Sequence, residues 1–263
     1  MNNKSPLRYP GGKTRACKKL DVILKEHFDI HEFNNLVSPF FGGGSFEFHI
    51  QNKYGLKIIA NDKFIPLYNF WSTCKSDKDI MCRELVKRIN SIDKEEFTRL
   101  RQTIMGNNDQ ISQSTMYFII NRCSFSGATL SGGFSLEASK KRFTLSSIDK
   151  IKNLNLTNFE IYNLDFEEFI CLHNSTNSNQ RNLMFLDPPY YIQSTLYGNN
   201  GDMHYDFDHD KLYNCLLTKT NWIMTYNNCD YIRNLYKDFK IIETCWTYGM
   251  NKSKESSEIV IIG

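Results

Sequence analysis

Hydrophobic and polar positions follow two patterns along this chain, short apolar runs and helical periodicity. Short apolar runs bounded by turn-forming residues predict buried strands. They are Leu36–Ser38, Leu56–Ala60, Phe159–Tyr162, Leu183–Leu186, Trp222–Tyr226, Ile241–Thr244 and Ile259–Ile262. Helical periodicity fills most of the gaps between them, as at Thr14–Glu26 and His209–Leu217. Strands that alternate with helices predict an α/β fold with a mainly parallel sheet, covered on both faces.

The middle of the chain interrupts this alternation. Between Asn61 and Phe159 no strand pattern is clear, and helical patterns take its place. They cover Lys78–Ile89, Lys94–Met105 and Ser114–Asn121. A Gly/Ser-rich stretch at 123–143 then predicts turns or a hairpin loop. We therefore expect an α/β domain formed by residues 1–65 and 155–263, interrupted by a helical insertion over residues 66–154.

Net positive charge is concentrated in this insertion. Residues 75–155 hold 14 Lys or Arg against 9 Asp or Glu, whereas the whole chain has a net charge of only +3. A locally basic segment suits a polyanion such as nucleic acid, although a solvated helical surface would look the same.

Several other classes of protein are not expected from this sequence. The chain has no run of eighteen apolar residues, and its start lacks the apolar core of a signal peptide, so we expect a soluble, intracellular protein. The eight cysteines include no CxxC pair and the six histidines form no spaced cluster, so no metal site is expected.

A glycine loop and an acidic residue suggest a nucleoside-containing ligand. The loop VSPFFGGGSFEF (37–48) follows a predicted strand and opens a helix, and its glycines let backbone pass close to a ligand. The next strand ends at Asp62, twenty residues after Gly42. In βαβ nucleotide-binding units an acidic residue at about that distance bonds the ribose hydroxyls.

The N-terminal segment YPGGKT (9–14) is not a phosphate-binding loop. That motif requires a glycine where Leu7 stands, and no strand precedes the segment. It nevertheless places an aromatic ring, two glycines and the cation of Lys13 before a helix. Such a group could clamp a carboxylate.

The stretch LMFLDPPYY (183–191) ends a predicted strand in a carboxylate, two prolines and two tyrosines. Prolines lack N–H groups, so the Asp187 carboxylate and the Pro188 carbonyl are acceptors without competing donors. Such a turn suits an exocyclic amine on a planar base that stacks on Tyr190. Accepting both amine hydrogens would free its lone pair for attack, without any enzyme nucleophile. A purely structural turn is the alternative.

Taken in order, YPGGK, SPFFGGGS, Asp62 and DPPYY resemble the Dam-type (D12) class of DNA adenine-N6 methyltransferases. The resemblance covers nearly the whole chain. It implies a Rossmann-like class I methyltransferase fold with a seven-stranded sheet, S-adenosylmethionine as cofactor, and duplex DNA as substrate. The helical insertion would be the target-recognition domain, and the target adenine would be flipped out of the duplex.

The same resemblance assigns roles to residues. Tyr9, Gly12 and Lys13 would hold the cofactor, with Lys13 near its methionine carboxylate. The backbone around Phe41, Gly42 and Gly44 would pack against the methionine part, Asp62 would bind the ribose and Asp165 would lie near the adenine. Asp187, which would also contact the cofactor, forms the catalytic motif with Pro188, Pro189 and Tyr190.

Target reading is expected in the basic insertion. Arg122, at the base of the predicted hairpin, could contact a guanine, or it could serve only a structural pairing. Lys140, Lys141 and Arg142 would grip phosphates. The asparagine-rich continuation of family members that read GATC is missing, so a GATC target is not expected.

Three alternatives remain open at this point. The amine could belong to cytosine N4 or to RNA, or the chain could be a DNA-binding protein that keeps the fold without catalysis. An enzyme could serve a restriction system or act alone in regulation. We expect a monomer.

Overall fold

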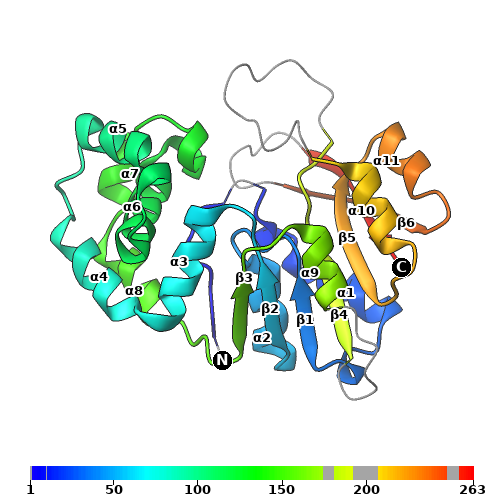
Figure 1. The fold of residues 1–263 in the computed structure, drawn as a ribbon. Helices are drawn as coiled ribbons and strands as arrows, with labels where there is room; N and C mark the ends of the chain where they lie inside the picture. Colours follow the sequence, from blue (N-terminus) through cyan, green and yellow to red (C-terminus); the bar gives the residue numbers. More distant parts are fainter. Residues whose placement is uncertain (1, 10, 174–180, 192–206, 248–254) are drawn as a thin grey trace.

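The computed structural model describes the chain except residues 1, 10, 174–180, 192–206 and 248–254. A seven-stranded sheet with the order β3-β2-β1-β4-β5-β7-β6 lies at its centre (Figure 1). The strands are β1 Asn35–Ser38, β2 Lys57–Asn61, β3 Phe159–Tyr162, β4 Asn182–Leu186, β5 Trp222–Asn227, β6 Lys240–Thr247 and β7 Glu255–Ile262. All seven predicted strands are present, and the predicted α/β fold with a seven-stranded sheet is confirmed.

The first five strands are parallel, and β7 is antiparallel between β5 and β6. The strand order reverses between β1 and β4, which are direct neighbours with Val37 paired to Met184. Open α/β sheets bind their ligands at such a reversal, beyond the carboxyl ends of the strands. The glycine loop after β1 and the DPPY turn after β4 both lie at this edge.

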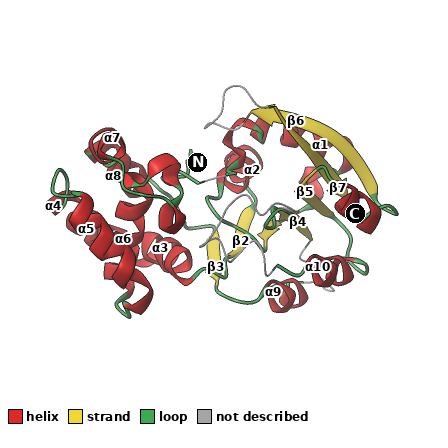
Figure 2. Ribbon diagram, turned by 90° about the horizontal axis from the view of Figure 1, so that it is seen from above, coloured by secondary structure: helices red, strands yellow, loops and turns green. Residues whose placement is uncertain are grey.

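Helices cover both faces of the sheet (Figure 2). Helices α1 (Cys17–His27) and α2 (Ser45–Tyr54) lie on one face, and α9 (Phe166–Leu172) and α10 (His209–Leu216) on the other, with α11 (Asp230–Leu235) near β6. Successive residues of β1 point to opposite faces, so Leu36 packs in the core under α1 and α2, and Val37 in the core under α9 and α10.

Six helices lie between β2 and β3 in sequence and beside β3 in space (Figures 1 and 2). They are α3 Ile65–Ser76, α4 Lys78–Lys87, α5 Lys94–Thr103, α6 Gln110–Cys123, α7 Leu136–Lys141 and α8 Leu145–Lys152. Helix α6 is buried from Gln113 to Cys123 because the other helices surround it. The hydrophobic core of the bundle continues to Phe41 in the loop after β1 and to Phe159 of β3. The division into two domains stays a prediction.

The prediction of turns or a hairpin over 123–143 is wrong in its second half. A single antiparallel bridge joins Ser124 to Phe134, and two short 3-10 turns lie between them. Helix α7 then begins at Leu136, because the Ser135 side chain accepts a hydrogen bond from the Ala138 N–H and caps it.

In the described part of the chain no helix is both long and apolar enough to cross a membrane. The same residues contain no cluster of three or more His, Cys, Asp or Glu side chains that could hold a metal ion.

Candidate active site

The glycine loop after β1 is held in an open, left-handed conformation. Gly42 has φ +50° and Gly44 has φ +65°, values that side-chain-bearing residues rarely adopt. A Cβ on Gly42 would lie 2.8 Å from Cε1 of Tyr9. The loop therefore needs glycine both for its backbone angles and for close contact with the N-terminal segment.

Asp62, which directly follows β2, fixes this loop by a hydrogen bond to its backbone. Its Oδ2 accepts the Gly42 N–H at 2.9 Å and its Oδ1 accepts the Phe64 N–H at 3.0 Å. The carboxylate is buried, and burial raises its pKa to about 6 although the two backbone donors oppose the shift. On the other side, the Gly42 carbonyl accepts the Trp71 indole N–H at 2.9 Å.

Phe41 anchors the glycine loop to the core. The ring is buried and packs edge-on against Phe48 and Trp71. The Phe41 N–H donates to the Asn61 carbonyl at 2.9 Å and its carbonyl accepts the Gly44 N–H at 2.9 Å, so its ring and backbone both fix the loop.

The N-terminal segment places Lys13 beside Asp187. The Gly12 N–H donates to the Tyr9 carbonyl at 3.0 Å, which forms a tight turn, and the Lys13 side chain is only 4% exposed. Its Nζ lies 2.8 Å from Oδ1 and 2.9 Å from Oδ2 of Asp187, and it also donates to the Gly11 carbonyl at 3.1 Å.

The predicted catalytic turn is thus joined to the N-terminal segment that is predicted to hold the cofactor. Asp187 also accepts a hydrogen bond from Oγ1 of Thr225, a buried residue of β5, at 2.7 Å. Lys13 Nζ lies 5.0 Å from the ring centroid of Tyr190. Lys13, Asp187 and Tyr190 therefore form one cluster at the strand-order reversal.

Tyr190 is fixed by residues that the sequence did not suggest. Its hydroxyl donates to Oε2 of Glu258 at 2.6 Å, and this carboxylate is 1% exposed. Its ring stacks on Tyr226 at 5.8 Å between centroids, and the Tyr226 hydroxyl is hydrogen bonded to Nδ1 of His209. Polar residues within the apolar runs of β5 and β7 were the available signal for Thr225 and Glu258.

Glu47 of α2 is a second buried carboxyl group near the cluster. It is 2% exposed and accepts the Ser38 hydroxyl at 2.7 Å. Burial raises the pKa of Glu47 to about 8, with the charge of Asp187 adding to the rise and that of Lys13 opposing it.

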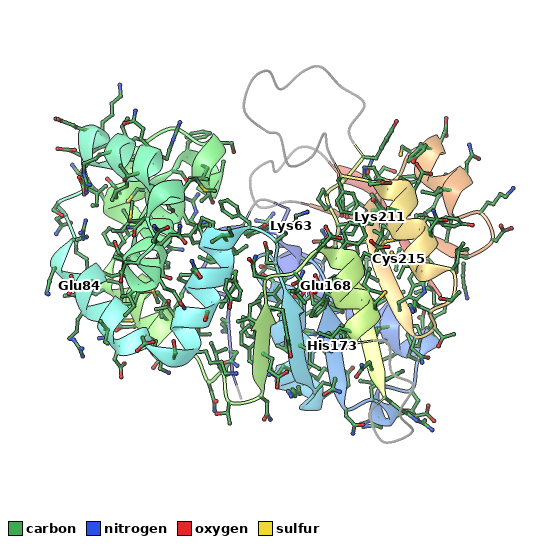
Figure 3. The ribbon with its side chains drawn as sticks, in the orientation of Figure 1. Lys63, Glu84, Glu168, His173, Lys211 and Cys215 are labelled. Carbon is green, nitrogen blue, oxygen red and sulfur yellow. The ribbon has the colours of Figure 1, made fainter. Side chains whose placement is uncertain are left out.

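Asp165 lies beside the sheet edge but apart from the Lys13 cluster. It caps α9 by accepting the Glu167 N–H at 3.2 Å, and it pairs with Lys63 at 2.9 Å and Lys211 at 3.5 Å. Figure 3 shows Lys63 and Lys211 at the same end of the sheet. Burial, the largest single influence, would raise the pKa of Asp165, but the hydrogen bonds from Lys63 and the Glu167 N–H and the charges of Lys63 and Lys211 together lower it.

Arg122 lies mostly buried at the end of α6. It is 8% exposed, and its Nε and Nη1 donate to the carbonyls of Arg142 at 2.7 Å and Pro6 at 3.2 Å. Its guanidinium lies 5.9 Å from the ring centroid of Phe118. Two of its nitrogens thus have backbone partners within the protein, which favours the structural-pairing alternative, and a guanine contact by Arg122 stays a prediction.

The remaining predicted DNA contacts lie on the surface at α7. Lys140, Lys141 and Arg142 are exposed, and Lys141 pairs with Glu137 at 3.0 Å. Arg8, which the sequence did not single out, lies near Arg142 and Arg122. Burial is the main reason that the pKa of Arg8 is lowered, and repulsion from Arg142 adds to it. The pKa of Arg122 is lowered to about 10, again mainly by burial and then by repulsion from Arg8 and Arg142. An anion there would relieve this repulsion.

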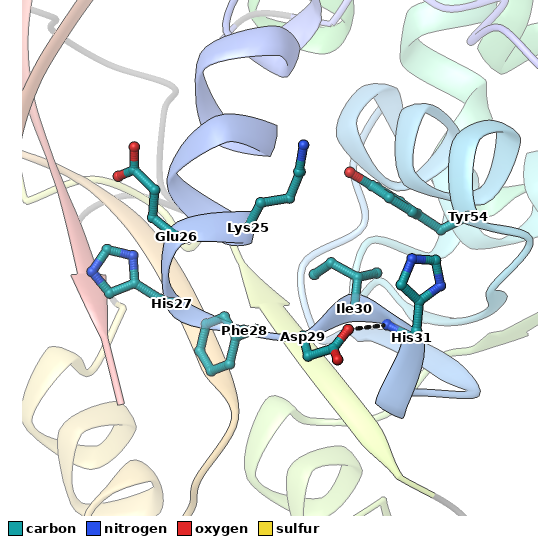
Figure 4. Close-up of a pocket in the computed structure, with 8 residues that line it drawn as sticks. All are labelled: Lys25, Glu26, His27, Phe28, Asp29, Ile30, His31 and Tyr54. Atoms are coloured by element: carbon teal, nitrogen blue, oxygen red, sulfur yellow. Dashed lines mark hydrogen bonds between the residues drawn. The ribbon is translucent and has the colours of Figure 1, made fainter.

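A surface pocket at the end of α1 lies apart from these motifs (Figure 4). Two of its polar groups have local structural partners. His27 Nδ1 is hydrogen bonded to the Ile23 carbonyl at 2.8 Å, and Asp29 accepts the His31 N–H at 3.1 Å. The pocket therefore adds nothing to the active-site cluster.

Comparison with known proteins gives a family match over most of the chain. The model of the D12 class N6 adenine-specific DNA methyltransferases matches residues 9–250. The chain is similar to the type II methyltransferase M.MjaIII of Methanocaldococcus jannaschii, at 24% identity over 92% of this chain and 90% of that protein. It is also similar to the type II methyltransferase M.CviBI of Paramecium bursaria Chlorella virus NC1A, at 24% identity over 90% and 87% of the two chains.

Proposed function

Because the chain belongs to the D12 class of N6 adenine-specific DNA methyltransferases, we propose that it methylates the N6 amine of an adenine flipped out of duplex DNA. The methyl donor in this proposal is S-adenosylmethionine. The observation that carries it is the Lys13–Asp187–Tyr190 cluster at the carboxyl edge of the sheet, beside the glycine loop.

The residues at this edge fit the cofactor. Lys13 is a buried cation suited to a carboxylate, and Asp62 is a buried carboxylate suited to ribose hydroxyls. Each oxygen of Asp62 accepts one backbone N–H and keeps lone-pair capacity for a second donor. Bound S-adenosylmethionine would supply an electrophilic methyl group on its sulfonium.

The protein's own part in the reaction is acceptance and orientation. In our proposal the Asp187 carboxylate and the Pro188 carbonyl accept the two N6 hydrogens, which directs the nitrogen lone pair toward the methyl group. The ring of Tyr190 stacks against the base. Thr225 fixes one Asp187 oxygen at 2.7 Å, so the acceptor is oriented before the base arrives.

The helical insertion would bind the duplex through its charged surface. Lys140, Lys141 and Arg142 lie exposed at the end of α7, and Arg8 lies near Arg142. We propose that these four side chains grip phosphates, which position the duplex without reading its sequence. Because the two relatives are named type II methyltransferases, we further propose that this chain is the modification enzyme of a restriction system.

The test is nucleoside mass spectrometry of a random-sequence duplex incubated with the protein and S-adenosylmethionine. We expect N6-methyladenine from the unaltered protein and about 10²–10³-fold less or lower still from Asp187→Ala. Only N4-methylcytosine, or methylation confined to RNA, would contradict the proposal. DNA binding without any methylation would instead support a non-catalytic protein.

A further inference from the structure

Asn121, near the end of α6, holds the backbone of a residue 113 positions away. Its Oδ1 accepts the Arg8 N–H at 2.9 Å, and its Nδ2 donates to the Arg8 carbonyl at 2.8 Å. The Asn121 side chain is fully buried. One amide side chain thus satisfies both backbone groups of Arg8, as a neighbouring strand would.

Two neighbours of Asn121 hold the same segment. Arg122 donates to the Pro6 carbonyl at 3.2 Å. Gly127 has φ +74°, and a Cβ there would lie 2.6 Å from the Arg8 carbonyl oxygen, so the loop after α6 packs directly on Arg8. The helical insertion therefore fixes residues 6–8 through side chains and through backbone contact.

This segment leads directly into the candidate cofactor site. Tyr9, the next residue, packs against the glycine loop, and Lys13 lies five positions after Arg8 and pairs with Asp187. Residues 2–9 belong to no helix or strand, so their position depends on partners elsewhere in the fold. A shift at Arg8 would be transmitted to the ring of Tyr9 and the ammonium group of Lys13.

We propose that Asn121 is a positioning residue for the methyl-transfer site, which acts by holding Arg8 so that Tyr9 and Lys13 lie correctly for the cofactor. This inference rests on the proposed function. It gives the Asn-Arg pair at the end of α6 a role in placing the cofactor segment, instead of a role in reading DNA.

Substitution by aspartate tests the proposal with little change of shape. Asn121→Asp keeps an acceptor for the Arg8 N–H but turns the donor toward the Arg8 carbonyl into a second acceptor. We expect the affinity for S-adenosylmethionine, measured by calorimetry without DNA, to fall about tenfold. At saturating cofactor, kcat should change less than about threefold, because the acceptors at Asp187 remain.

A purely structural role is separated by a control of matched stability. Ile148 is buried in α8 and is not among the residues bonded to residues 6–8 in the described structure. Ile148→Val or Ile148→Ala, chosen to match the loss of unfolding free energy of Asn121→Asp, should retain the affinity for S-adenosylmethionine. If Asn121→Asp does not fold, Arg122→Gln serves in its place and should weaken binding in the same direction.

Unchanged cofactor affinity in the folded Asn121 or Arg122 variant would overturn the proposal, as would an equal loss of affinity in the Ile148 control. Failure of the proposed function has a different signature, because the unaltered protein would then leave no N6-methyladenine in duplex DNA, whatever its affinity for S-adenosylmethionine.

Discussion

The side chains of Lys13 and Asp187 meet across 174 residues of sequence, and Lys13 Nζ lies within 2.9 Å of both carboxylate oxygens. The pair joins the N-terminal segment to the turn that follows β4. Both oxygens of the Asp187 carboxylate, the proposed acceptor of one amine hydrogen, are therefore held by a cation. An entering carboxylate would compete with Asp187 for Lys13, which links cofactor binding to the release of the acceptor.

The first prediction concerns Asp187. Asp187→Ala removes a charged acceptor from a partly enclosed site, so methylation should fall by about 10²–10³ or more. Single-turnover rates on a methylatable duplex measure the loss. Asp149→Ala, on the exposed face of α8, is the control and should retain full activity. Turnover of Asp187→Ala near that of the unaltered protein would exclude the acceptor role.

Cofactor affinity should depend on Lys13 and Asp62. Alanine at either position should weaken S-adenosylmethionine binding by about 1–3 kcal/mol, because each removes a buried charged partner. Calorimetry on the purified variants measures this. If both variants bind as tightly as the unaltered protein, the cofactor lies elsewhere.

The same site should respond to pH through Asp62. Its pKa of about 6 means that the carboxylate becomes neutral as pH falls from 7 to 5, and a neutral carboxyl is a weaker acceptor for ribose hydroxyls. The affinity for S-adenosylmethionine should fall over this range. In Asp62→Asn the affinity should be lower but nearly independent of pH, and a parallel pH dependence in that variant would argue against Asp62 as the titrating group.

Glu47 should make the protein less stable at high pH. Its pKa rises from the usual 4.5 to about 8 on folding, so between these values the folded protein binds a proton more tightly than the unfolded chain. The contribution of this group to the free energy of unfolding therefore falls as pH rises from 4.5 to 8. Glu47→Gln keeps an acceptor for the Ser38 hydroxyl and should be more stable than the unaltered protein at pH 8, by roughly 2–4 kcal/mol.

Urea unfolding at pH 5 and pH 8 measures this difference. Glu168→Gln, at an exposed position on α9, is the control and should leave the pH dependence unchanged. A Glu47→Gln variant that loses stability equally at both pH values would show that the carboxyl group is not protonated in the folded state.

Lys140 and Lys141 should contribute to DNA binding without sequence preference. The double variant Lys140→Gln, Lys141→Gln should weaken binding to all duplexes, and the slope of log K against log salt should fall in magnitude by about 2. Fluorescence anisotropy across a salt series measures the slope. Lys237→Gln with Lys240→Gln, at exposed positions near α11, is the control pair, and an equal change there would remove the special role of α7.

Tyr190 and Glu258 should act as one unit. Tyr190→Phe and Glu258→Gln each disturb a buried hydrogen bond of 2.6 Å, and each should lower kcat about 3- to 10-fold. The double variant should lose little more than either single variant, because the two residues share that bond. Tyr231→Phe, which removes a bond to the exposed Asp210, is the control. Additive losses in the double variant would mean that the bond does not orient Tyr190.

The sequence by itself determined the strands, the fold class and the order of the motifs. Apolar runs bounded by turns are local signals, so the strands at Leu183–Leu186 and Ile259–Ile262 could be predicted from neighbouring residues alone. The glycine loop, Asp62 and the DPPY turn follow strand ends. Parallel strands bring such ends to one edge of a sheet, so their proximity was also predictable.

Only the tertiary structure decided which side chains meet. Thr225 and Asp187 are 38 residues apart, Glu258 and Tyr190 are 68 apart, and no periodicity relates either pair. The contacts of Arg122 could not be predicted for the same reason. An arginine beside a Gly/Ser-rich stretch has the sequence pattern of a DNA contact. Once α6 is buried within the helical bundle, however, its guanidinium must satisfy its donors inside the protein, and the nearest acceptors are backbone carbonyls from distant parts of the chain.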